Sequence, residues 1–409
     1  MRCRTCLYPN TKPDLWFDET GQCSACIAYN NRPEIDWEAR KQDLYRLLER
    51  HGGKCIVPSS GGKDSTYIAL TLKAMGADVT SVTATTCHLT PIGRYNIDNL
   101  ARHVQTIEVT PNQTVRAKLN RIGLELVGDI SHPEHMAIFT VPFKMAAALN
   151  IPLLFYGECP QNQYGGPQGS ENAKHLTGRW RSEFGGFLGL RPSDLIGMEG
   201  ITERDMQYYQ FPDDIKNVEA HFLGYYLPWD SHVNARVSIE NGMKAELPCE
   251  ANWWEWENLD NLDTFWHDQG MYRKYGYGRF VSQISVDIRS GLISRSDALK
   301  LSHQYDGFVS DTYCGLSIYD SADRIGLSKE EMWKCLDKFT NWDLFNDISN
   351  NRLLIKEADW LKCPFCNKYD DPNNLYIYPN KNAGKHRECF NKYRKEHVAL
   401  CKDYTRSAA

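Results

Sequence analysis

The residues SGGKDST (60–66) form the segment best suited to hold a phosphate compound. An apolar run (54–59) precedes them and a helical pattern (62–76) follows, so they lie between a strand and a helix. Paired glycines permit a tight turn with exposed amides, and a helix N-terminus favours an anion. The alternative is a plain glycine turn, which Lys63 makes less favoured. The candidate nucleotide-binding residues are Ser60, Gly61, Gly62, Lys63, Asp64, Ser65 and Thr66.

A first cysteine group lies at the N-terminus. Cys3-x2-Cys6 and Cys23-x2-Cys26 have the spacing of a tetrathiolate zinc ribbon. Four thiolates close the coordination sphere, so the sequence predicts structural zinc, with iron as the less expected alternative.

A second Cys/His group lies in the tail and also suits zinc. Its ligands are predicted to be Cys363, Cys366, His386 and Cys389, with His397 or Cys401 as alternatives to the histidine. The tail is basic, with 10 Lys and Arg against 5 Asp and Glu in residues 361–409, although the whole chain carries −5. Nucleic-acid binding and simple packing against the protein are both open for this module.

Strand and helix patterns alternate from residue 54 to residue 157, which predicts an α/β fold with a doubly wound parallel sheet. The helix expected at 135–150 is predicted to be interrupted near Pro142, and residues 220–229 to form a further strand. The predicted domains are a zinc ribbon (1–34), the sheet domain (35–230), a mainly helical region (231–355) and the Cys/His module (356–409).

The chain has no apolar run of the length that a membrane helix needs and no signal-peptide core at its N-terminus. These features predict a cytoplasmic protein that makes no membrane contact.

The SGGKDS motif resembles the signature of the PP-loop ATP pyrophosphatases, which include GMP synthetase, NAD synthetase, argininosuccinate synthetase and tRNA thiolases. The spacing between its glycines and lysine is too short for the G-x-x-x-x-G-K-[ST] loop of other nucleotide hydrolases. The resemblance implies that the loop holds the pyrophosphate of ATP while the α-phosphate is attacked, and that Asp64 helps to hold Mg²⁺.

Longer stretches, in order over roughly residues 1–310, resemble the N-acetyl sugar amidotransferases of bacterial surface-polysaccharide synthesis. They are LTPIGRYNIDNLARH (89–103), VRAKLNRIGLELVGDISHPEHMAIFTVPFKMA (115–146), FYGECPQNQYGGP (155–167), FLGYYLPWDSH (222–232) and HDQGMYRKYGYGRFVSQISVDIRSGLISRSDAL (267–299). This resemblance implies that ATP adenylates an acetamido oxygen of a sugar and that ammonia then replaces the oxygen to give an acetamidino group, with release of AMP and pyrophosphate.

The chain contains no Gly-x-Cys-x-Gly glutaminase motif. The resemblance therefore implies that a separate HisH-like glutaminase, with a HisF-like subunit, supplies the ammonia.

Candidate site residues follow from these stretches. The catalytic candidates are Lys63, Asp64, Glu158 and His267. The substrate-binding candidates are Asn162, Gln163, Tyr164, Lys274 and Arg279. Further polar candidates are Asn96, Asn99, Asp129, His132, Glu134, His135, Asp287 and Arg289; those at 129–135 could equally form a helix cap.

Two other functions remain open at this stage. A PP-loop enzyme that amidates or thiolates tRNA or DNA bases could use the basic tail to bind nucleic acid, although the acidic body and the absence of a core CxxC pair count against thiolation. A non-catalytic zinc-stabilised scaffold is the second alternative.

Overall fold

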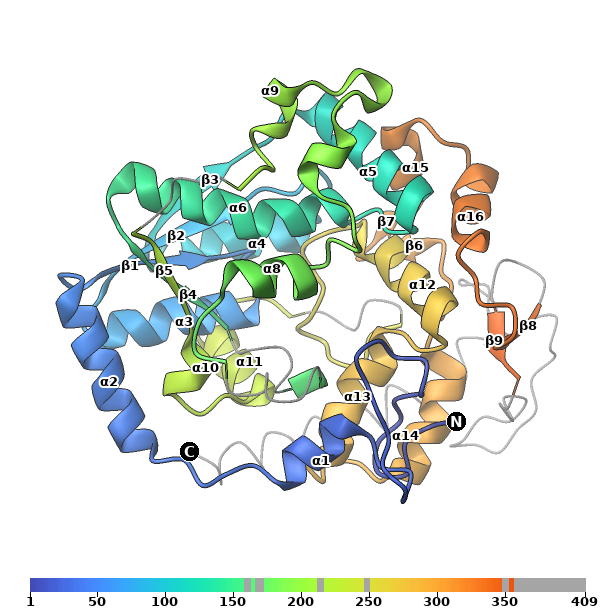
Figure 1. Ribbon diagram of the computed structural model, residues 1–409, viewed down its shortest axis with the longest axis horizontal. Coiled ribbons are helices and arrows are strands. Elements are labelled where there is room, and N and C mark those ends of the chain that lie inside the picture. Colours follow the sequence, from blue (N-terminus) through green and yellow to red (C-terminus); the bar gives the residue numbers. More distant parts are fainter. Residues whose placement is uncertain (158–162, 166–172, 212–216, 246–250, 348–352, 357–409) are drawn as a thin grey trace.

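The computed structural model describes residues 1–157, 163–165, 173–211, 217–245, 251–347 and 353–356. At its centre lies a five-stranded, wholly parallel sheet with the strand order β3-β2-β1-β4-β5 (Figure 1). The strands are β1 (Lys54–Pro58), β2 (Asp78–Ala84), β3 (Gln105–Val109), β4 (Leu153–Tyr156) and β5 (Glu219–Phe222). The α/β class predicted from the alternating pattern is confirmed.

Helices cover both faces of the sheet, as Figure 1 shows for α6 and α3. Alternate residues of β1 explain this arrangement, because successive side chains of a strand point to opposite faces. Cys55 and Val57 pack with the α2 and α3 side, whereas Ile56 packs with the α5 and α6 side. The helices of this half are α2 (Trp37–Arg50), α3 (Lys63–Ala74), α4 (Pro91–Leu100), α5 (Gln113–Val127) and α6 (His132–Leu149).

The segment from 173 to 240 adds short elements around β5. They are α8 (Gly178–Phe184), the 3-10 helices η1 (Pro192–Leu195) and η2 (Met198–Gly200), α9 (Glu203–Met206), α10 (Leu223–Tyr226) and α11 (Ser231–Glu240). The strand predicted at 220–229 is only partly correct, since β5 ends at Phe222 and a helical turn follows it directly.

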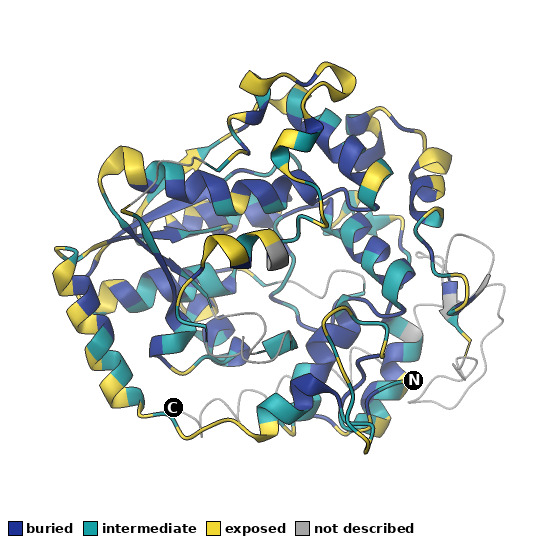
Figure 2. Ribbon diagram, viewed as in Figure 1, coloured by how far each residue is buried: buried dark blue, intermediate teal, exposed yellow. Residues whose placement is uncertain are grey.

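The region that follows is mainly helical, as predicted. Its helices are α12 (Thr264–Tyr275), α13 (Arg279–Arg289), α14 (Arg295–Tyr305), α15 (Asp320–Ile325) and α16 (Lys329–Asp337). Two small antiparallel pairs complete it: β6 (Thr312–Tyr313) with β7 (Leu316–Ser317), and β8 (Phe345–Asp347) with β9 (Leu353–Ile355). Buried residues gather along the sheet and on the inward faces of these helices (Figure 2).

Helix α6 continues through Pro142 without interruption, which corrects the prediction of a break there. A proline inside a helix costs about 3 kcal/mol. Its neighbours Val141 and Phe143 are buried in the core that α6 forms with the sheet. Tertiary packing therefore outweighs the local preference. No helix among the described residues is long and apolar enough to cross a membrane.

The N-terminal cysteine module, which includes α1 (Ser24–Asn30), packs on the helical region rather than standing apart from it. The amide of Leu7 donates to Oγ of Ser285 on α13 at 3.3 Å. Nε of Arg295, at the start of α14, donates to the carbonyls of Cys3 and Cys6 at 3.0 and 3.1 Å. Residues distant in sequence thus share one core.

His221 on the edge strand β5 is almost fully buried, with 1% of its surface exposed. Its Nδ1 lies 2.7 Å from the hydroxyl of Tyr226, and its Nε2 lies 3.1 Å from Glu219 Oε2. A neutral ring satisfies both contacts by accepting from the tyrosine and donating to the carboxylate. Burial lowers the pKa of His221 to about 4. Glu219 opposes this shift, whereas His175 and Lys174 lower the pKa further.

The buried His221 should make the protein lose stability in mild acid. Below about pH 6.5 the unfolded chain binds a proton at this histidine that the folded chain refuses until about pH 4. The free energy of unfolding should therefore fall by roughly 3 kcal/mol across this window from this group. In His221→Gln that component is lost, so urea titrations from pH 7 to pH 4.5 should show a shallower decline. His103→Gln, at a more exposed position, should decline as the unmodified protein does; equal slopes for His221→Gln would contradict the assignment.

Candidate functional site

The candidate phosphate loop connects the carboxyl end of β1 to α3, which begins at Lys63. β1 lies between β2 and β4. The chain runs from β1 to β2 and β3 on one side, and then crosses to β4 on the other side of β1. Ligands of doubly wound sheets bind at such a switch point, outside the carboxyl ends of the strands. The strand-turn-helix context expected for SGGKDST is therefore present.

Gly61 makes a contact that only glycine allows. Its φ is +78°, and a Cβ placed on it would lie 2.6 Å from the backbone nitrogen of Ile97 on α4. The loop is thus pressed against α4. Gly62 differs, since an added Cβ there would meet only Oγ of Ser60 at 3.4 Å.

The hydroxyl groups of the loop hold its shape. Ser59 Oγ accepts from the amide of Gly61 at 2.9 Å and donates to Ser65 Oγ at 2.9 Å. Thr66 is buried, and its hydroxyl donates to the carbonyl of Gly61 at 3.4 Å. Ser59 and Thr66 therefore fix the turn that exposes the remaining loop groups.

Lys63 is the electrostatic centre of the loop. It is 3% exposed, and its Nζ donates to Asp64 Oδ2 at 2.6 Å and to Glu257 Oε1 at 2.7 Å. Burial alone would lower the pKa of Lys63, but the two carboxylates raise it above its usual range. Burial likewise opposes the ionisation of Glu257, and the charge of Lys63 lowers its pKa overall. The ammonium group is therefore charged.

The loop faces a pocket of about 460 Å³. The pocket is lined by residues 58–65, by the start of α6, by residues 256–261, and by parts of α12 and α13. The mainly helical region thus supplies much of a pocket whose phosphate loop belongs to the sheet. The predicted nucleotide-binding residues on its lining are Ser60, Gly61, Gly62, Lys63, Asp64 and Ser65.

Two imidazoles on this lining, those of His135 and His267, meet the carboxylate of Asp129. Nδ1 of His267 lies 2.8 Å from Asp129 Oδ1, and Nδ1 of His135 lies 3.7 Å from Asp129 Oδ2. Burial opposes the charge of Asp129, yet His267 and His135 lower its pKa below the usual range. Burial lowers the pKa of His135 to about 4, whereas Asp129 raises that of His267 despite burial. The three ligand atoms lie within 4.8 Å of one another and could hold a metal ion.

Substrate-binding candidates are divided between the pocket and its surroundings. Arg279 lines the pocket, and its guanidinium pairs with Asp268 at 2.9 Å. Tyr164 lies close enough to Arg279 to raise its pKa. Gln163 donates to Ser231 Oγ at 2.7 Å, and Lys274 donates to the carbonyl of Val127 at the end of α5. Among the described residues, Gln163 and Lys274 are engaged in protein contacts rather than on the lining.

Several further polar candidates have mainly structural contacts. Glu134 accepts from Arg116 Nη1 at 2.7 Å and Asn120 at 2.9 Å, although it also reaches the pocket lining. His132 contacts the carbonyl of Phe187 at 3.1 Å. These contacts fasten α5 and the segment around 187 to the start of α6.

Asn96 and Asn99 fasten α4 to the chain beyond α11. Asn96 donates to the carbonyl of Lys244 and accepts from its amide, and Asn99 donates to the carbonyl of Asn241.

Asp287 and Arg289, on α13, support the neighbouring segments. Asp287 accepts from His232 at 2.8 Å and from the indole nitrogens of Trp253 and Trp254. Arg289 donates to the carbonyl of Gln163.

Some candidates lie outside the described residues. They are Glu158, Asn162, Cys363, Cys366, His386 and Cys389.

Sequence reasoning missed Glu257, which pairs with Lys63, and two of its neighbours on the lining, Trp256 and Asp260. Trp256 is buried and its Nε1 has no partner among the described residues. Burial raises the pKa of Asp260, and Ser60 hydrogen-bonds to its side chain. Only the density of acids and tryptophans in WWEWENLDNLD (253–263) hinted at these roles.

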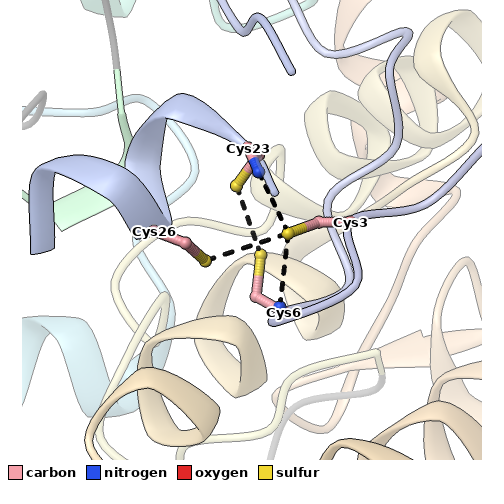
Figure 3. Close-up of side chains that lie close together, drawn as sticks. All are labelled: Cys3, Cys6, Cys23 and Cys26. Atoms are coloured by element: carbon pink, nitrogen blue, oxygen red, sulfur yellow. Dashed lines mark hydrogen bonds between the residues drawn. The ribbon is translucent and has the colours of Figure 1, made fainter. Parts of the chain in front are cut away.

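The four N-terminal cysteines converge as their spacing predicts (Figure 3). The Sγ atoms of Cys3 and Cys26 are 3.9 Å apart, and those of Cys6 and Cys23 are 3.6 Å apart. Four thiolates at about 2.3 Å from a tetrahedral ion would be separated by about 3.8 Å. The amides of Cys6 and Cys23 also donate to Cys3 Sγ. The donor set and its geometry therefore suit a closed, structural metal site.

Comparison with known proteins gives one family match. Residues 260–360 match the family described as LPS biosynthesis protein WbpG-like, C-terminal domain. Over this segment, which includes α12 to α16, the chain is similar to a WbpG-type LPS biosynthesis protein. No curated protein matches the chain.

The two loop glycines provide a matched test of the close approach to α4. Gly61→Ala should lower the free energy of unfolding by about 2–4 kcal/mol, because it combines a positive φ with a contact too short for a Cβ. Gly62→Ala should cost no more than about 1 kcal/mol. Urea unfolding measures both, and equal losses would contradict this account of the loop.

The cysteine cluster should contain zinc. We expect the double variant Cys6→Ser and Cys23→Ser to lose one equivalent of zinc per chain relative to the unmodified protein, as measured by elemental analysis. Since the cluster packs on α13 and α14, the melting temperature of the double variant should also be lower than that of the unmodified protein. Cys55→Ser, at a buried cysteine outside the cluster, should retain the full zinc content. Unchanged zinc in the double variant would exclude this site.

Proposed function

We propose that the protein is an ATP-dependent amidotransferase that converts the acetamido group of an N-acetyl sugar into an acetamidino group in lipopolysaccharide or polysaccharide synthesis. The observation that carries this proposal is the position of the Gly61–Lys63 loop at the switch point of the sheet, facing a pocket shared with the helical region. The similarity of residues 260–360 to a WbpG-like domain supports the sugar-polymer setting.

The loop suits the pyrophosphate part of ATP. The first amides of α3 offer donors and a positive potential to an anion, and the charged Lys63, here paired with Asp64 and Glu257, lies beside them. Mg²⁺ would neutralise part of the phosphate charge, and Asp64 is the carboxylate available to help hold it. Nδ2 of Asn234 orients Asp64 by donating to its second oxygen at 3.0 Å.

The reaction requires two displacements. The amide oxygen of the sugar attacks the α-phosphorus of ATP, and the bond to pyrophosphate breaks. Ammonia then attacks the activated carbon, AMP leaves with the former amide oxygen, and loss of a proton gives the amidine. The imidate must be kept from water, because water would regenerate the amide.

The far side of the pocket is suited to the acceptor. His267 and Arg279 lie there on α12 and α13, and the buried indole of Trp256 has an unpartnered N–H among the described residues. Such a mixture of one apolar surface and a few donors is typical of small-molecule sites.

Ammonia would come from a separate HisH-like glutaminase, with a HisF-like subunit as a second partner. This part of the proposal rests on the absence of a glutaminase motif in the sequence. We assign structural zinc to the cysteine cluster, with no part in the reaction.

The test is formation of AMP. Purified protein with MgATP, ammonium and a panel of free and nucleotide-linked N-acetyl sugars should release AMP and pyrophosphate only with the true acceptor. Mass spectrometry with isotopically labelled ammonium should show oxygen replaced by labelled nitrogen in the sugar. AMP release that depends on tRNA or DNA instead of any sugar would overturn the proposal in favour of base modification.

Lys63→Ala should lower kcat/KM by roughly 100-fold or more, since it removes a fixed positive charge beside the phosphates. Lys63→Arg keeps the positive charge and is the matched control for the loss of that charge. Circular dichroism checks that both variants are folded, so that a folding defect is not mistaken for a catalytic effect. Lys73→Ala, at an exposed position on the same helix, should retain activity. Full activity in Lys63→Ala would contradict the assigned role of the loop.

A further inference from the structure

We propose that Asp129, His135 and His267 form a second metal centre that holds a divalent transition metal beside the pocket, which His135 and His267 line. The three residues come from separate parts of the fold. Asp129 lies in the turn between α5 and α6, His135 lies in the first turn of α6, and His267 lies on α12. Their convergence on one point is therefore a product of tertiary structure.

The separations of the ligand atoms are close to those around a metal. Nitrogen and oxygen ligands lie about 2.0–2.2 Å from a transition-metal ion, which places neighbouring ligands about 3.0–3.6 Å apart. His267 Nδ1 and Asp129 Oδ1 are hydrogen-bonded at 2.8 Å, just below this range, and His135 Nδ1 lies 3.7 Å from Asp129 Oδ2, just above it. All three ligand atoms lie within 4.8 Å of one another, so small rotations of the side chains would bring them to a shared ion.

His135 carries the observation that points to a missing partner. Its Nδ1 is buried and, among the described residues, makes no hydrogen bond of ordinary geometry, although the backbone of Gly186 and the carboxylate of Asp129, at 3.7 Å, lie beside it. The backbone passes close to this nitrogen at Gly186, where a Cβ would lie 2.6 Å from it. An unpaired buried nitrogen is costly, and a metal ion at this position would satisfy it.

Two positively charged side chains, Lys274 and Arg279, lie near the cluster, and both are held by other partners. Lys274 lies close enough to lower the pKa of Asp129, but its Nζ is bound to the carbonyl of Val127. Arg279 is paired with Asp268. The positive groups nearest the site therefore already have partners.

Two imidazoles and one carboxylate select the class of metal. This set favours Zn²⁺, Mn²⁺, Fe²⁺ or Co²⁺ over Mg²⁺ and Ca²⁺, which prefer oxygen ligands. Three protein ligands also leave coordination positions open, and two of the three, His135 and His267, line the pocket. An ion here could bind an oxygen of a substrate; that role, unlike the binding of the metal, rests on the proposed function.

Manganese is the probe that separates this centre from the cysteine cluster, because it disfavours thiolate ligands. Full-length protein treated with a mild chelator, so that only the thiolate-bound zinc remains, should bind one equivalent of Mn²⁺ in the absence of ATP and sugar, seen as loss of the electron paramagnetic resonance signal of the free ion. Asp129→Asn, His135→Gln and His267→Gln should each weaken binding by about 100-fold or more. His175→Gln, an exposed histidine elsewhere, should bind as the unmodified protein does.

The outcomes are distinguishable. Absence of Mn²⁺ binding, or equal binding by the three variants, would overturn the metal centre and leave the amidotransferase proposal intact. Loss of binding in the other two variants but not in His135→Gln would also overturn the three-ligand site. Circular dichroism confirms that each variant is folded before its binding is measured.

Discussion

The pocket depends on one buried charge. An ammonium group taken out of water costs several kcal/mol unless it is paired and hydrogen-bonded, and Lys63 meets this requirement with Asp64 from its own helix and Glu257 from a distant segment. The phosphate loop can therefore be ordered only when the segment around residue 257 is in place. The sheet and the helical region are joined at the point where the ligand would bind.

The support for Glu257 continues away from the pocket. Gln283 on α13 donates to Glu257 Oε2 at 3.0 Å and accepts from the amide of Trp253 at 2.6 Å. The opposite side of α13 packs on the N-terminal cysteine module. A continuous series of contacts thus leads from the cysteine cluster through α13 to Lys63. A zinc site that never touches the substrate can in this way affect the geometry of the loop.

The sequence predicted the parts whose cause is local. The period of apolar residues gave β2 and β3 at their observed bounds, and the short spacing of CxxC pairs gave the cysteine cluster. It failed where distant contacts decide. Pro142 stays helical because its neighbours are buried, and Glu257 is unremarkable until folding brings it to Lys63. Asp129 and His267 are 138 positions apart, so only the fold could show that they meet.

The contacts of the cysteine module have a consequence for the order of events during synthesis. Leu7 and Ser285 are separated by 278 positions, and Cys3 and Arg295 by 292. The module leaves the ribosome before the helices that receive it, which are made nearly three hundred residues later. Local thiolate spacing lets it close around a metal early, whereas docking must wait for α13 and α14. A chain stopped before residue 257 would carry a closed cysteine module without the helices that bury it, beside an α/β core in which Lys63 still lacks Glu257.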